Sequence, residues 1–219
     1  MCGFAGFVGE VENREQVLEN MIDTIIHRGP DSSGKFVDED AALGFRRLSI
    51  IDLSESGDQP LYNEHRRKVL VFNGEIYNYQ ELREELIQAG HTFVSNTDSE
   101  TLIHGYEQWG EELVYRLRGM YAFAIWDQKA KRLFSARDIF GIKPLYYAQM
   151  NGTLMFGSEI KSFLEHPKFD KVFNEEALGN YLSFQFVPTN ETFFKGVFCV
   201  QPGHYFTYEN GKMNITRYF

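Results

Sequence analysis

The sequence predicts an α+β fold in which two antiparallel sheets pack face to face with helices outside them. Aromatic residues make up 16% of the 219 residues, including 20 Phe and 12 Tyr, and flat rings pack well on pleated sheets. Short strand-like runs between residues 121 and 156 follow one another with brief polar turns, as in antiparallel sheets. No linker or repeat divides the chain, so we expect one domain over residues 1–219.

The first third of the chain predicts strands around one helix. Residues 1–9 form a glycine-punctuated apolar segment that is typical of a strand. Residues 14–27 carry apolar side chains at the spacing of an amphipathic helix. Strand-like runs follow at residues 41–45 and 68–72, and Asn73-Gly74 is expected to close the second run.

Two helix starts are marked by polar residues. Asn78 can cap a helix over residues 79–89, and Thr97 with Glu100 fits a capping box for a helix over residues 98–109. The remaining expected elements are strands at 121–126, 132–136, 145–148 and 153–156, helices near 159–165 and 174–182, and a hairpin over 203–219 that turns at Asn210-Gly211.

Composition excludes several classes of function. The net charge of -9 argues against a nucleic-acid partner, because a cationic surface is needed to displace counterions from phosphates. No apolar run is long enough to cross a bilayer and no amino-terminal signal segment is present, so we expect a cytoplasmic protein without a membrane partner. The two cysteines, Cys2 and Cys199, predict no disulfide framework, and no protein-bound metal is expected.

A cysteine at position 2 is the first candidate for chemistry. Removal of Met1 would leave a free α-amine and a thiol on the same residue. An α-amine has a reference pKa of ~7.7–8.0, so part of it can accept a proton at neutral pH, and a thiol is a strong nucleophile. Taken alone, a cysteine at this position is usually inert.

Four further segments each have a simple structural explanation. His27-Arg28-Gly29-Pro30-Asp31 can be a helix stop, and Asn73 to Asn78 can be a turn followed by a helix cap. Thr97 to Glu100 can be a capping box, and Arg47, at the start of Arg47-Leu48-Ser49-Ile50, can be a surface ion-pair residue. Individually, these patterns predict structure and not a site.

Together with Met1-Cys2-Gly3, these segments point to a known family. The HRGPD, RLSI, NGEIYN and TDSE segments, followed by Arg137 to Tyr147, occur in the order and spacing of the glutaminase domain of glutamine-dependent asparagine synthetases. The sequence resembles that family from Cys2 to about Gly203. The resemblance implies a class II glutamine amidotransferase with the four-layer αββα sandwich of amino-terminal-nucleophile (Ntn) hydrolases.

The resemblance also implies roles for individual residues. Cys2 would be the nucleophile, with Asn73 and Gly74 forming the oxyanion hole. Arg47 would bind the α-carboxylate of L-glutamine and Asp98, helped by Glu75, its α-ammonium; these chemical types suit a free amino acid with two opposite charges. Ile50 would complete the substrate-binding set, and Arg28 would belong to a loop beside the site.

The expected reaction is hydrolysis of glutamine to glutamate and ammonia, which a synthetase domain would use to amidate aspartate. No SGGxDS or GxxxxGK[ST] loop is present, so the carboxy-terminal synthetase domain is expected to be missing, together with its ATP and Mg²⁺. Alternatives are another acceptor, such as a cell-wall or secondary-metabolite carboxylate or a sugar phosphate, or a non-catalytic glutamine-sensing module. A homodimer is left open.

Overall fold

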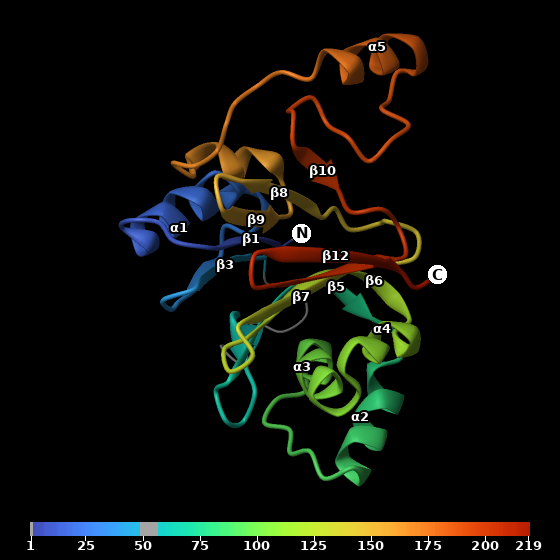
Figure 1. The fold of residues 1–219 in the computed structure, drawn as a ribbon. Coiled ribbons are helices and arrows are strands. Elements are labelled where there is room, and N and C mark those ends of the chain that lie inside the picture. Colours follow the sequence, from blue (N-terminus) through green and yellow to red (C-terminus); the bar gives the residue numbers. More distant parts are fainter. Residues whose placement is uncertain (1, 49–56) are drawn as a thin grey trace.

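The chain folds into two stacked antiparallel sheets enclosed by helices, as the sequence predicts (Figure 1). The structure, a computed structural model, describes residues 2–48 and 57–219. In the first sheet the strands lie in the order β10-β8-β9-β1-β3-β2, and in the second they lie in the order β12-β11-β7-β6-β5-β4. Helix α1 covers the outer side of the first sheet, and α2 and α3 cover the outer side of the second (Figure 1).

The bounds of the elements follow chain order. The strands are β1 (Gly3–Val8), β2 (Ser32–Val37), β3 (Ala41–Arg47), β4 (Leu61–Tyr62), β5 (Lys68–Ile76), β6 (Gly119–Asp127), β7 (Arg132–Arg137), β8 (Tyr146–Met150), β9 (Thr153–Gly157), β10 (Val197–Cys199), β11 (His204–Glu209) and β12 (Lys212–Arg217). The α-helices are α1 (Arg14–Asp23), α2 (Tyr79–Gln88), α3 (Asp98–Trp109), α4 (Leu113–Arg116) and α5 (Glu175–Phe184). Short 3₁₀ helices are η1 (Ile26–Arg28), η3 (Gly110–Glu112) and η4 (Ile160–Glu165).

Three apolar clusters separate the four layers. Alternate residues of each strand face opposite sides of a sheet, so one strand contributes to two clusters. In β1, Phe4 lies in the cluster between the sheets, whereas Phe7 packs against α1. In β5, Val71 faces the space between the sheets and Phe72 faces α3. The sequence prediction of two packed sheets is therefore confirmed.

Several element boundaries differ from their prediction. The first helix ends at Asp23 and not at residue 27, and the chain continues into η1. Strand β5 runs through Asn73-Gly74 to Ile76. A Cβ at Gly74 would collide with the carbonyl oxygen of Met120 on the neighbouring strand, so this glycine permits close strand pairing and does not make a turn.

Both predicted helix caps are wrong in their side-chain contacts. Asn78 precedes α2 without a capping hydrogen bond, because its side chain bonds to the backbone of Arg116 and Arg118. Thr97 precedes α3 without one as well, and Glu100 accepts hydrogen bonds from an earlier loop. The segment predicted as a helix near residues 159–165 is the 3₁₀ helix η4. The carboxy-terminal hairpin turns at Asn210-Gly211, as predicted, with both residues at positive φ.

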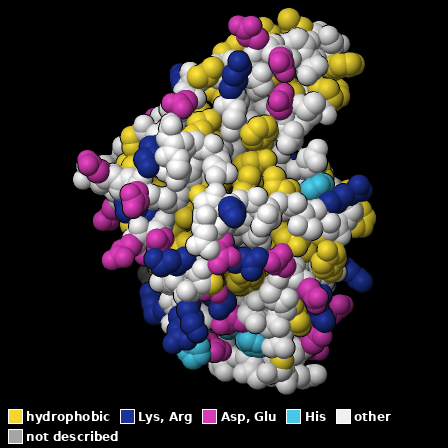
Figure 2. Space-filling view, in the orientation of Figure 1, with side chains coloured by type: hydrophobic (Ala, Val, Ile, Leu, Met, Phe, Trp, Pro, Cys, Tyr) yellow, Lys and Arg dark blue, Asp and Glu magenta, His cyan; other side chains and the backbone are white. Residues whose placement is uncertain are grey.

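Helix α5 projects from the rest of the molecule at the top of Figure 1. Its apolar side chains Leu178, Tyr181, Leu182 and Phe184 are exposed, and Figure 2 shows apolar atoms at the surface of this end. None of the helices in the described part of the chain combines the length and apolar composition that crossing a membrane requires.

Candidate active site

The space between the two sheets holds the side chains that the sequence marks for chemistry. Cys2 precedes β1 and packs against the cluster between the sheets. On β3, Ala41, Leu43 and Phe45 face this space, and strand alternation places Arg47 on the same face. On β5, Val69 and Val71 face it, so Asn73 and Glu75 follow in the same direction. Three neighbouring segments thus direct Cys2, Arg47 and Asn73 toward one region.

Cys2 is half-buried and held through both its backbone and its thiol. The Leu48 N–H donates to the sulfur at 3.4 Å, and the sulfur lies 3.7 Å from the Leu48 carbonyl oxygen. The carbonyl of Cys2 accepts a hydrogen bond of 2.9 Å from Nε of Arg28. Met1, whose removal would free the α-amine of Cys2, lies outside the described residues.

Asn73 is a buried amide with an unused donor. The residue is 2% exposed, and its Nδ2 has no hydrogen-bond partner among the described residues. Buried polar groups are nearly always hydrogen-bonded, and an unsatisfied one costs about 1–3 kcal/mol. An open amide donor on the face toward which Cys2 packs is suited to receiving a negatively charged oxygen of a bound reactant.

Of the two predicted substrate-binding residues Arg47 and Ile50, only Arg47 lies in the described part of the chain. Arg47 is 7% exposed, and its Nη1 donates to Oδ1 of Asp58 at 2.8 Å. The Asp58 side chain is 45% exposed, so Arg47 joins the buried site to a carboxylate at its rim. Ile50 lies outside the described residues.

Asp98 and Glu75 form a pair of carboxylates at the end of β5. Oδ2 of Asp98 accepts a hydrogen bond of 2.8 Å from the N–H of Ile76. Burial raises the pKa of Asp98; bonds from backbone N–H groups oppose this rise, and the charge of Glu75 adds to it. Two neighbouring carboxylates make an environment that favours a cationic group.

Arg28 connects the start of β1 to a glutamate far along the chain. While Nε holds the carbonyl of Cys2, Nη1 donates to Oε1 of Glu159 at 2.9 Å. Burial alone would raise the pKa of Glu159, but hydrogen bonds from Arg28, Lys161 and His27 hold it below its usual value. The family resemblance predicted Arg28 beside the site, whereas no local sequence pattern marks Glu159.

Lys143 is a second charged residue whose place near Arg28 was not predicted from the sequence. It is 5% exposed, and its pKa is lowered by burial and by the charge of Arg28, with Cys2 and Glu75 acting in the opposite direction. Asp138, which is fully buried, orients this loop by accepting the backbone N–H groups of Ile142 and Lys143. In the sequence, Lys143 could have been recognised as the single cationic residue within the apolar run from Phe140 to Leu145.

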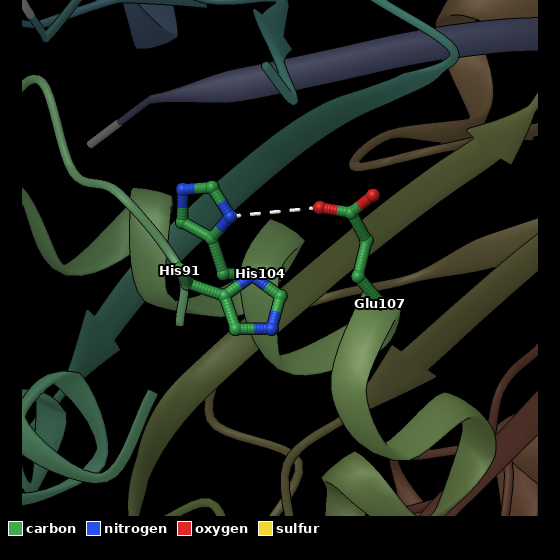
Figure 3. Close-up of side chains that lie close together, drawn as sticks. All are labelled: His91, His104 and Glu107. Atoms are coloured by element: carbon green, nitrogen blue, oxygen red, sulfur yellow. Dashed lines mark ion pairs between the residues drawn. The ribbon is translucent and has the colours of Figure 1, made fainter. Parts of the chain in front are cut away.

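A separate cluster of possible metal ligands lies beside α3. Among the described residues, His91, His104 and Glu107 place one ligand atom each within 4.8 Å of the others (Figure 3). Burial would lower the pKa of His104, but interactions with Glu100 and Glu107 raise it to about 9. His104 lies 3.5 Å from both Glu100 and Glu107, so ion pairing accounts for the contacts among these residues of α3. The absence of a protein-bound metal stays a prediction.

The architecture agrees with the fold that the resemblance implies. Two stacked antiparallel sheets between helical layers, with β1 beginning beside a cysteine at position 2, are the arrangement of Ntn hydrolases. The same fold occurs in glutamine phosphoribosylpyrophosphate amidotransferase from B. subtilis, with a TM-score of 0.72 and 20% identity over 100% of this chain and 49% of that chain. A family model for the glutamine amidotransferase domain matches residues 1–219, and the chain belongs to this family.

Two named relatives are similar in sequence to nearly the whole of this chain. The chain is 46% identical to asparagine synthetase [glutamine-hydrolyzing] 1 of Bacillus subtilis, over 100% of this chain and 35% of the relative. It is 36% identical to the amidase chry2 of Gibberella zeae, over 94% of this chain and 32% of the relative. The chain therefore spans about a third of the length of these relatives. The resemblance inferred from the motifs is confirmed.

Proposed function

We propose that this chain hydrolyses L-glutamine to glutamate and ammonia through the thiol of Cys2. The observation that carries the proposal is the buried Nδ2 of Asn73, a donor with no partner among the described residues on the face toward which Cys2 packs. Such a donor has a use when a tetrahedral intermediate places an oxyanion there.

The chemistry proceeds in two half-reactions. The Cys2 sulfur attacks the side-chain carboxamide carbon of glutamine, and the α-amine, freed by removal of Met1, takes the thiol proton. Asn73 Nδ2 and the Gly74 N–H stabilise the oxyanion. The amine then protonates the departing nitrogen, ammonia leaves, and water hydrolyses the γ-glutamyl thioester to glutamate.

Charged residues select the free amino acid. Arg47 receives the α-carboxylate of glutamine, since a planar guanidinium matches two carboxylate oxygens. Asp98 and Glu75 receive the α-ammonium, and the raised pKa of Asp98 falls once this cation neutralises the pair. Ile50 completes the substrate-binding set, and Arg28 acts from beside the nucleophile.

The ammonia is the substrate of a synthetase partner domain. We propose that residues 1–219 act as one glutaminase domain and that a synthetase domain with ATP and Mg²⁺ amidates aspartate, as the name of the Bacillus subtilis relative suggests. Transfer of ¹⁵N from amide-labelled glutamine into asparagine by the full protein tests this acceptor. A cytoplasmic location agrees with the two free cysteines.

The decisive experiment combines intact mass with a glutamate assay. Loss of the Met1 mass and glutamate release that disappears in Cys2→Ala are expected. The matched control is Cys199→Ala, which removes the second thiol, contacted by Arg137 at 3.0 Å, and should keep activity. A processed, folded chain that binds glutamine without turnover would instead support a sensing module.

A further inference from the structure

The segment that follows β9 holds the first residues of β1. Ser158, which is fully buried, donates its N–H to the carbonyl of Phe4 at 2.9 Å and accepts the N–H of Phe4 on Oγ at 3.1 Å. The next residue, Glu159, is the carboxylate that binds Arg28. One short segment therefore anchors β1 directly at Phe4 and through a side chain at Cys2.

The guanidinium of Arg28 is a rigid bridge between these two points. Nε bonds to the Cys2 carbonyl and Nη1 to Glu159, both at 2.9 Å, and the Arg28 side chain is 11% exposed. Gly3 makes this path available, because a Cβ on Gly3 would lie 2.7 Å from Cδ of Arg28. Because the guanidinium group of Arg28 is planar, a bond that fixes the position of Nη1 also fixes the direction in which Nε points.

Glu159 is itself held from both sides. Its Oε1 also lies 3.0 Å from Nε2 of His27, and its Oε2 pairs with Nζ of Lys161 at 3.1 Å. With a side chain that is 25% exposed, Glu159 is partly shielded from solvent. The carboxylate therefore has a defined orientation, and it passes that orientation to Arg28.

We propose that Glu159 is a positioning residue for the nucleophile: it holds Arg28 so that Arg28 fixes the carbonyl of Cys2, and the thiol then faces Asn73. This inference rests on the proposed role of Cys2. Glu159 touches neither substrate nor sulfur. A displacement of about 1 Å at a reacting group can reduce a rate about 100-fold, so a distant anchor has a measurable effect.

The first test compares Glu159→Ala with Glu165→Ala, an exposed glutamate at the end of η4, the 3₁₀ helix that begins directly after Glu159. We expect Glu159→Ala to lower kcat for glutamate release about 10- to 100-fold, with KM changed less than about threefold, since positioning acts on the chemical step. Glu165→Ala should match the wild type. Glu159→Gln keeps an oxygen acceptor for Arg28 and should recover most of kcat.

A double-mutant cycle tests the route through Arg28. If Glu159 acts through Arg28, Glu159→Ala should cause no further loss of kcat in an Arg28→Ala background. The proposal would be overturned if the double variant lost kcat by the product of the two single-variant losses. It would also be overturned if Glu159→Ala kept the wild-type kcat. If Glu159→Ala fails to fold, Glu159→Gln and Arg28→Lys replace it; Arg28→Lys should lose kcat because one ammonium cannot replace the planar fork.

The proposed function and this inference can fail separately. A wild-type chain without Cys2-dependent glutamate release would refute the proposed function. Amide hydrogen exchange over residues 2–8 would then decide the anchoring role alone. Faster exchange in Glu159→Ala than in Glu165→Ala supports it, and equal exchange refutes it.

Discussion

Glu159 and Glu100 are two glutamates that each bind several donors and a histidine, yet they lie in different settings. Glu100 is 3% exposed and accepts the N–H groups of Val94 and Ser95 at 2.7 Å and the hydroxyl of Ser95 at 2.6 Å. His104 lies 3.5 Å away on the next turn of α3. All these partners lie within residues 94–104, so Glu100 fastens one loop to one helix.

Glu159 instead joins distant parts of the chain. Arg28 is 131 positions away in sequence and leads directly to Cys2. Glu100, which is itself buried and has only local partners, stabilises the local fold, whereas Glu159 connects residues on two sides of the site and orients them. The same side chain therefore serves stability beside α3 and, as proposed here, catalysis beside β1.

The largest expected effect is on stability at Glu100. Glu100→Ala should lower the free energy of unfolding by about 3–5 kcal/mol, because it removes the acceptor of two backbone N–H groups and of the Ser95 hydroxyl, together with one of the two carboxylates that pair with buried His104. Glu159→Ala should cost less than about 1 kcal/mol, as for partly exposed pairs. Urea denaturation of both variants measures this difference, and the reverse ranking would contradict the comparison.

Two buried asparagines extend the same contrast. Asn73→Ala should lower kcat about 100- to 1000-fold, equivalent to about 2.7–4 kcal/mol of barrier, with little change in stability. Asn63 is the matched control, since it is 3% exposed and its amide bonds to Glu107, Arg67 and Lys68. Asn63→Ala should destabilise the fold and preserve kcat. Steady-state kinetics and urea midpoints of both variants decide; wild-type kcat in Asn73→Ala would remove Asn73 from the oxyanion hole.

The cluster beside α3 also predicts a pH dependence of stability. The pKa of His104 rises from 6.5 to about 9 in the folded protein, so its contribution is fully present below pH 6.5 and is lost as the pH rises through about 9. Hydrogen bonds to charged groups suggest a loss of about 1.5–3 kcal/mol. Unfolding curves between pH 6 and 10 should show this loss, and it should be absent in His104→Gln.

The smallest predicted effect concerns substrate binding. Arg47→Lys should raise KM for glutamine about tenfold, or about 1.4 kcal/mol, because an ammonium cannot form two parallel bonds to a carboxylate. The value of kcat should stay close to the wild type. Kinetics with glutamine measure both constants, and an unchanged KM would remove Arg47 from carboxylate recognition.

Local sequence patterns predicted most of the fold and failed where contacts are distant or competitive. Helix α3 has the predicted bounds, residues 98–109, although the capping box from which it was predicted does not form. Strand β2, whose sequence is SSGKFV, lacks clear alternation and was missed. The cap at Asn78 failed because the backbone of Arg116 and Arg118 bonds to its side chain. At Thr97, the hydroxyls of Ser95 and Ser99 bond to the side chain instead.

Prediction of the site depended on the family resemblance and not on periodicity. Cys2, Arg47 and Asn73 were identified from motifs, and the structure directs them toward one region. Glu159 could not be identified, because its contact with Arg28 joins residues 131 positions apart. The open donor of Asn73 was also invisible in sequence, since burial without a partner is a property of the folded state.

The pairing of β5 with β6 also bears on folding fidelity. The two strands pair from Lys68 opposite Asp127 to Ile76 opposite Gly119. A slip by one position would turn Asn73 toward the helices and would bring Leu70 and Phe72 between the sheets. Chains that folded with this shifted register would be compact but inactive. Correct pairing of β5 with β6 is therefore required for activity as well as for the fold.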